Sequence, residues 1–206
     1  MGKETPSIRK TLAAASKATT LRIHFPEAAA REAGVRLSTA ASKPAPTLSM
    51  SVSTSASSPD ARYLAVSIDL DAPFPSFPFL GPILHGLHVD LVLDAAAADD
   101  DGFAPLRSAA AAAVADEEEE KEEEKEEEEW LVPYVGPGPP RPSAAHRYLF
   151  MVFAQPPALD AAGIRALLGL GTDVGLMTRM RWDQEAFERR LGLGEVLAGS
   201  YFLTRA

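Results

Sequence analysis

Four residues in the middle of this sequence combine a carboxylate with side chains that can donate hydrogen bonds. Asp69 opens the run DLDAP, His85 ends the run GPILH, and His146 and Tyr148 belong to the run HRY. Histidine and tyrosine donate hydrogen bonds to phosphate or carboxylate oxygens, and a protonated histidine adds a positive charge. If folding brings these residues together, they predict a pocket for a small anion.

Proline-rich segments adjoin these side chains. The run GPGPP at 136–140 precedes HRY, and Pro73 ends DLDAP. Each proline locks its own φ angle, so strand ends beside such turns are held rigidly. We therefore expect Asp69, His85, His146 and Tyr148 to meet at one mouth formed by the ends of strands.

Several other kinds of site find no support. The chain has no cysteine, which excludes disulfides, thiolate metal sites and a thiol nucleophile. His85 and His88 are three residues apart, a spacing that places them on opposite faces of a strand, so we expect no metal site and no cofactor. The run at 136–140 lacks the lysine and the following helix of a P-loop. No serine lies in a Gly-x-Ser-x-Gly elbow, which argues against triad hydrolysis.

The elements that must position these residues are mainly strands. Apolar and polar residues alternate over 64–70 and over 87–93, which predicts two strands. His85 lies just upstream of the second strand, in phase with its apolar residues. The alternation in the first strand extends to place Asp69 and Asp71 on one face.

Further elements complete a mainly β, β-rich α+β chain. The run HRYLFMVF at 146–153 is apolar on both faces and predicts a buried central strand. Shorter strands are predicted at 21–25 and 48–52. Two helices are predicted near the C-terminus, one over 157–168 and one over 183–192, the second with an aspartate at its start and a glycine at its end.

The negative charge of the protein is concentrated in one segment. The net charge is −9, but residues 94–129 hold 16 acidic and three basic residues, which leaves +4 for the rest. Within 95–129 an alanine-rich tract precedes the run DEEEEKEEEKEEEE, and neither can build a packed core. We expect a low-complexity insertion at 95–129 in a single domain of 21–206. The insertion could be inert or could dock a basic partner. Basic residues elsewhere form no stripe, so no nucleic-acid binding is expected.

Residues 1–20 are predicted to form a helical or flexible N-terminal segment. They lack the continuous apolar stretch of a signal peptide, which favours a cytoplasmic protein. The basic, alanine-rich opening could be a weak transit signal, but Glu4 and a single arginine argue against this. No run approaches the ~20 apolar residues that span a bilayer, so we expect no integral membrane association.

The motifs resemble the paired signatures of the phosphatidylethanolamine-binding protein family. These signatures are DPDAP followed by a histidine on the next strand, and GPxPP followed by HRY on a central strand. The pieces WLVPYVGPGPP and GPILH are similar to fungal members, and the resemblance spans 21–202 apart from the insertion. It implies an antiparallel β-sandwich with a few short helices near the C-terminus. It also implies an anion pocket formed by Asp69, His85, Pro139, His146 and Tyr148.

The sequence departs from the family pattern at four positions. Leu70 stands where the family has proline, Gly86 where a large aromatic residue follows the histidine, and His88 and Asp90 where apolar or amide residues are common. Losing a ring at Gly86 is expected to enlarge the cavity, and His88 and Asp90 add titratable groups nearby. Drift would explain these changes, as would adaptation to a larger carboxylated or anhydride substrate.

The resemblance implies two classes of function. Fungal relatives are implicated in joining maleic anhydride monomers into maleidride rings, chemistry that needs proton transfer and stabilisation of an enolate-like anion. The candidate catalytic residues for such a step are His85, His88, His146 and Tyr148. The alternative is a non-catalytic protein that binds a phospholipid headgroup, inhibits a serine carboxypeptidase or modulates kinase or Ras signalling. The expected partners are a small anion (phosphate, carboxylate or anhydride) and possible partner enzymes or proteins.

Overall fold

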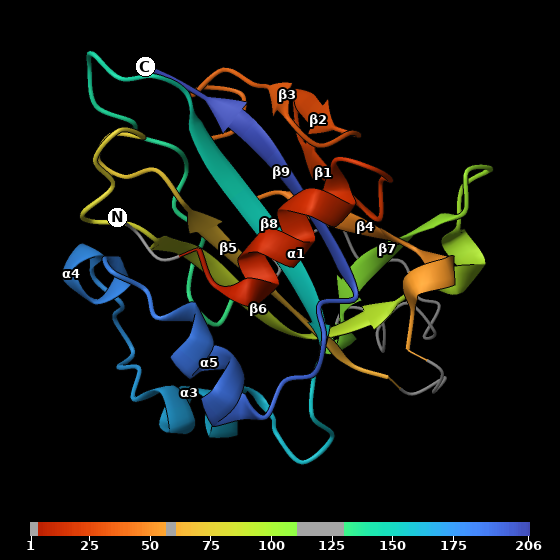
Figure 1. Ribbon diagram of the computed structural model, residues 1–206. Helices are drawn as coiled ribbons and strands as arrows, with labels where there is room; N and C mark the ends of the chain where they lie inside the picture. Colours follow the sequence, from red (N-terminus) through yellow and green to blue (C-terminus); the bar gives the residue numbers. More distant parts are fainter. Residues whose placement is uncertain (1–3, 57–60, 111–129) are drawn as a thin grey trace, which may run out of the picture.

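The computed structural model describes residues 4–56, 61–110 and 130–206. The strands in this part of the chain are β1 (Leu21–Phe25), β2 (Ala28–Ala30), β3 (Val35–Arg36), β4 (Thr47–Ser51), β5 (Tyr63–Asp69), β6 (Ile83–Leu93), β7 (Phe103–Ser108), β8 (His146–Ala154) and β9 (Ala198–Thr204). They form one sheet in the order β2-β1-β4-β7-β6-β5-β8-β9-β3 (Figure 1). All neighbouring strands are antiparallel except β3 and β9. The predicted strands at 21–25, 64–70, 87–93 and 146–153 are confirmed within a few residues.

The sheet curls so that β1 and β4 face β5, β8 and β9 across a buried core. The rings of Phe25 on β1 and Phe202 on β9 meet edge to face with centroids 5.5 Å apart. Tyr148 and Phe150 of β8 and Met50 of β4 belong to the same cluster. This arrangement confirms the predicted β-rich, sandwich-like fold.

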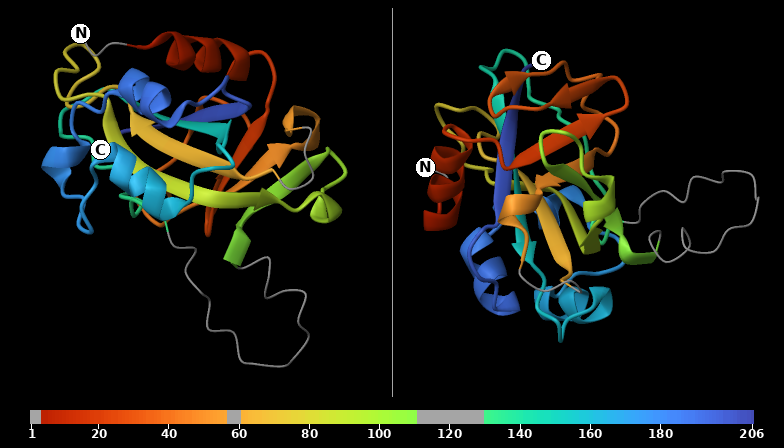
Figure 2. Two further views of the ribbon diagram at one scale, coloured as in Figure 1. Left: turned by 90° about the horizontal axis from the view of Figure 1, so that it is seen from below. Right: turned by 90° about the vertical axis from the view of Figure 1, so that its right-hand side faces the viewer.

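Helices cover the other face of the central strands. They are α1 (Pro6–Ala15), α3 (Ala161–Leu168), α4 (Leu176–Arg179) and α5 (Gln184–Leu191). Ile8, Ile164 and Phe187 of these helices pack with Leu64 of β5 and Met151 of β8 in a second cluster. Figure 2 shows α1 and α5 on one side of β9 and β1 on the other. Strands β5 and β8 are therefore buried on both faces, as the continuous apolar run in β8 predicts.

The helix boundaries follow from local capping. Helix α5 begins after Asp183, whose side chain accepts from a backbone N–H of the first turn, and ends at Gly192 with φ of 64°. The predicted helix over 183–192 is thus confirmed. Helix α3 begins after Asp160, which accepts from the N–H of Gly163, so the prediction of 157–168 begins too early. None of the helices in the described ranges is long and apolar enough to cross a bilayer.

The predicted insertion at 95–129 is wrong at its start. Strand β7 lies inside this range, and it pairs with β4 and β6 in the middle of the sheet. Phe103 and Leu106 of this strand are buried. The residues around β7 are rich in alanine and aspartate, so the sequence pattern did not predict this short strand, whose burial depends on its neighbours. The acidic run at 116–129 lies outside the described residues.

Candidate functional site

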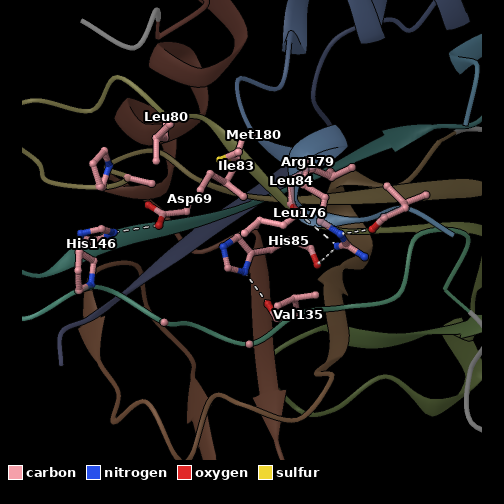
Figure 3. A pocket seen from close by; sticks show the side chains of 16 residues that line it. Asp69, Leu80, Ile83, Leu84, His85, Val135, His146, Leu176, Arg179 and Met180 are labelled. Atoms are coloured by element: carbon pink, nitrogen blue, oxygen red, sulfur yellow. Dashed lines mark hydrogen bonds and ion pairs between the residues drawn. The ribbon is translucent and has the colours of Figure 1, made fainter.

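A cavity of about 520 Å³ lies where the end of β5 meets the beginnings of β6 and β8 (Figure 3). The segment 135–140 and α4 complete its walls. Four polar side chains line it, namely those of Asp69, His85, His146 and Arg179. All other lining residues are apolar or glycine. Figure 3 shows Asp69 and His146 on one side of the cavity, Arg179 on the other and His85 between them.

Asp69 and His146 form a buried pair. Asp69 Oδ2 lies 2.9 Å from His146 Nδ1, while Oδ1 accepts from the backbone N–H of Asp71 at 2.8 Å. A carboxylate can only accept, so His146 carries a hydrogen on Nδ1. The Oγ of Ser143 lies 3.0 Å from His146 Nε2. The three residues are hydrogen-bonded in the order of a Ser–His–Asp triad. Ser143 does not line the cavity, however, so these hydrogen bonds orient His146 and Ser143 offers no nucleophile to the cavity.

His85 presents a free nitrogen to the cavity. Its Nδ1 donates to the backbone carbonyl of Val135 at 2.5 Å, which fixes the neutral ring as the Nδ1–H tautomer. Its Nε2 makes no hydrogen bond to any described residue. Burial lowers the pKa of His85, and the bond to Val135 and the charge of Asp69 oppose this only in part. A neutral His85 can therefore accept a proton at Nε2.

Tyr148 lies behind the cavity wall and supports both histidines. Its ring meets His85 edge to face at 5.1 Å and stacks on His146 at 6.4 Å. The buried hydroxyl has no hydrogen-bond partner among the described residues. Burial and the nearby negative charge of Asp69 raise the pKa of Tyr148. The predicted residue Pro139 is also buried, but the cavity is lined by its neighbours Gly138 and Pro140.

The prediction that His85 and His88 point to opposite faces is wrong. The pairing of β5 with β6 shifts register between Ser67 and Ile68, and His85 is the extra residue of this bulge. Because of this extra residue, His88 lies on the same face of β6 as His85, the inner face, where its ring stacks on the ring of Trp130 with centroids 4.9 Å apart. Burial there lowers the pKa of His88 to about 4. His88 does not line the cavity, so this candidate catalytic residue does not reach a ligand there.

Gly86 does not enlarge the cavity, contrary to prediction. A Cβ atom at Gly86 would stand 2.6 Å from two carbons of the Trp130 ring, so the indole already occupies this space. Asp90 also lies away from the cavity and accepts from Arg62 and Gln155 at 2.9 and 2.7 Å. The departures at Gly86 and His88 therefore change the packing against Trp130, and none of the three departures adds a titratable group to the lining of the cavity.

Asp71 serves a different purpose from Asp69. It accepts from the backbone N–H, Nε and Nη2 of Arg147 at 2.8, 2.9 and 2.7 Å. His146 and Arg147 are consecutive on β8, so their side chains, and the two carboxylates bound to them, lie on opposite faces. The predicted common face is wrong because β5 ends at Asp69. A further bond from Arg147 Nη1 to Glu4 attaches the N-terminal segment to the sheet.

Arg179 is the polar lining residue that the sequence did not reveal. It is only 5% exposed, and its Nε donates to the carbonyl of Val174 at 2.8 Å. Its Nη1 donates to the carbonyls of His85 and Leu84 at 3.2 and 3.5 Å. The surrounding run GLMTRMRW has no motif that distinguishes this arginine from its neighbours. Its burial follows only from the contact of α4 with β6.

Comparisons with known proteins identify one partial sequence relative and several structures of the same fold. Phomoidride biosynthesis cluster protein N of Talaromyces stipitatus is 38% identical over 72 residues, a match that spans only 34% of each chain. The structure is similar to a carboxypeptidase Y inhibitor solved with its cognate proteinase, with a TM-score of 0.61, 17% identity and coverage of 90% of this chain and 82% of the other.

A phosphatidylethanolamine-binding protein from Plasmodium vivax matches with a TM-score of 0.57 and 15% identity, over 90% of this chain and 84% of the other. At these identities, the two structural matches show a shared fold. The sequence model of the phosphatidylethanolamine-binding proteins matches residues 16–201, which include all the residues of the cavity. This chain belongs to the phosphatidylethanolamine-binding protein family.

Proposed function

We propose that the protein binds a small anionic ligand, a phosphate, carboxylate or anhydride, in this cavity and acts in maleidride-type polyketide biosynthesis. Its role there is to assist the coupling or cyclisation of anhydride monomers. The biosynthetic part rests on the partial similarity to the phomoidride cluster protein. The chemical part rests on one observation, the unbonded Nε2 of a neutral His85 in a mostly apolar cavity.

His85 is the group best placed to move a proton. A carbon acid held beside Nε2 loses its proton to this nitrogen, and the electron pair remains on the ligand as an enolate. The bond from Nδ1 to Val135 holds the ring in place and keeps Nε2 as the acceptor. The few polar groups of the cavity act in surroundings of low dielectric constant, where charge stabilisation is stronger than in water.

The test is the dimer yield from purified anhydride monomers, measured with and without the protein and with and without its partner enzymes. We expect the wild type to raise the yield and His85→Ala to abolish the gain, while His24→Gln, a substitution on β1 away from the cavity, keeps it. An unchanged yield with the wild type in every combination contradicts the biosynthetic role. Binding of phosphate or phosphoethanolamine without such a gain would instead identify a binding protein.

A further inference from the structure

The motif residues of the cavity leave no free cation for an anionic ligand. His146 donates from Nδ1 to Asp69, and its Nε2 lies against Ser143. His85 uses Nδ1 to donate to Val135 and presents Nε2 as an acceptor. Asp69 itself is negative and repels an anion. Arg179 is the remaining polar side chain of the lining, and it is cationic.

Arg179 supplies a permanent positive charge to the same cavity. Three backbone carbonyls bind its Nε and Nη1, but Nη2 makes no hydrogen bond to a described residue and is not cut off from solvent. Within the described part of the chain, no carboxylate lies at ion-pair distance from it. Carbonyl dipoles only partly offset a buried guanidinium charge, and the N–H groups of Nη2 remain free to donate a charge-assisted hydrogen bond to an anionic oxygen.

The walls between Arg179 and solvent are apolar. Leu176 of α4 and Val135 line the cavity and are 62% and 47% exposed, so they mark its mouth. Leu80 lines the cavity on the facing loop, and its carbonyl accepts from the N–H of Arg181 at 2.9 Å, which holds the loop beside the segment that follows α4. Figure 1 shows α4 at the edge of the molecule near this loop.

The loop that holds Leu80 also carries two exposed aromatic rings. Phe77 and Phe79 are 62% and 45% exposed, and their centroids lie 5.2 Å apart. Exposed apolar side chains gathered around a cavity mark a site for an apolar group. A short, fully polar anion would leave this surface uncovered.

We propose that the ligand is an amphiphilic carboxylate, with its head bound by Arg179 Nη2 and its alkyl chain lying along Leu176, Leu80 and the mouth. The inference deepens the proposed function, because it names the class of ligand and its direction in the same cavity. The reacting end of the ligand then lies between Arg179 and the Nε2 of His85. Each buried methylene strengthens binding roughly fourfold.

The experiment is calorimetric titration of the full chain with three probes: decanoate, acetate and the neutral decanamide. We expect decanoate to bind the wild type at least about tenfold more tightly than either other probe. Arg179→Gln weakens decanoate binding at least about tenfold and leaves decanamide binding unchanged. The exposed Arg190 of α5 provides the control, since Arg190→Gln alters neither affinity.

Five outcomes overturn the inference. Equal affinities of the wild type for decanoate and decanamide would remove the need for a cation, and this comparison requires no variant. Equal affinities for decanoate and acetate would remove the alkyl site. If Arg179→Gln weakened the binding of decanoate and decanamide equally, Arg179 would act only by holding α4 against β6. If phosphate binds or the dimer yield rises while decanoate does not bind, this inference alone is overturned. If no anion binds, the proposed function is overturned as well.

Discussion

The indole ring of Trp130 lies against the backbone of Gly86, so closely that no side chain fits between them. The carbonyl and N–H of Leu87 pair with those of Val132, which holds the segment after Trp130 along β6. The space over Gly86 is thus filled by a ring from another part of the chain. A change at Gly86 and a change at Trp130 must therefore affect each other.

Gly86→Ala tests this packing. The added methyl group displaces the buried Trp130 ring, and we expect a loss of about 1–3 kcal/mol in the free energy of unfolding. Trp130→Ala alone costs about 3–5 kcal/mol because it leaves a cavity. Urea unfolding of the double variant should show a smaller loss than the sum of the two, since the methyl group then has room.

Gly194→Ala is the matched control, because a Cβ atom at Gly194 meets nothing within 4 Å. It should change the free energy of unfolding by less than about 0.5 kcal/mol. Additive losses at Gly86 and Trp130 would contradict this direct contact between the two residues.

Arg147→Met tests the attachment of β8 to the turn after β5. The variant leaves the carboxylate of Asp71, which is 3% exposed, without its cationic partner and with only the backbone N–H of residue 147. We expect a loss of about 3 kcal/mol in the free energy of unfolding, the lower end for breaking a buried ion pair, because Arg147 is partly exposed. Glu4→Gln removes only the negative charge of the more exposed partner of Arg147 and should cost less than about 1 kcal/mol. Thermal or urea unfolding gives both values, and equal losses would contradict the distinction.

The parts of the fold that could be predicted depend on local chemistry. Asp183 and Gly192 set the two ends of α5 through hydrogen bonds within one turn. Strand β8 can be recognised from its apolar run alone, without knowledge of the strands that pair with it. Asp69, His85 and His146 line one cavity, as expected of strand ends beside rigid turns, whereas Tyr148 lies behind the cavity wall.

The parts that could not be predicted depend on pairing between distant segments. The bulge at His85 exists only in the register of β6 against β5, and it decides which face His88 occupies. The burial of Arg179 comes from carbonyls about 95 residues away. The ring that fills the space over Gly86 belongs to Trp130, whose position no pattern in the sequence links to β6.

The tautomer of His146 tests the buried pair at the cavity wall. A neutral His146 should carry its hydrogen on Nδ1, because Asp69 Oδ2 at 2.9 Å can only accept. Nitrogen NMR of the labelled ring should show a protonated Nδ1 and an unprotonated Nε2. Asp69→Leu removes the acceptor and should produce a mixture of tautomers, while Ser143→Ala should keep the Nδ1–H form. A wild type that carries the hydrogen on Nε2 would contradict this geometry.

The stability of the protein should fall as the pH is lowered from 7.5 to 4. Burial against Trp130 lowers the pKa of His88 to about 4 in the folded state, against 6.5 in the unfolded chain. Above pH 6.5 the ring is neutral in both states and the full stability is present. Below pH 6.5 the unfolded chain binds the proton first, so the free energy of unfolding falls until the folded state protonates near pH 4. The pKa difference corresponds to a loss of roughly 3 kcal/mol.

His88→Phe isolates this contribution. Phenylalanine keeps a flat ring against Trp130 but cannot bind a proton, so the variant should lose less stability than the wild type on acidification. The difference between their free energies of unfolding should change by roughly 3 kcal/mol between pH 7.5 and 4, in favour of the variant. His85 and His24, whose pKa values are also lowered by burial, remain in both proteins and cancel from this difference. Parallel curves for the two proteins over this range would show that His88 protonates as readily in the folded protein as in the unfolded chain.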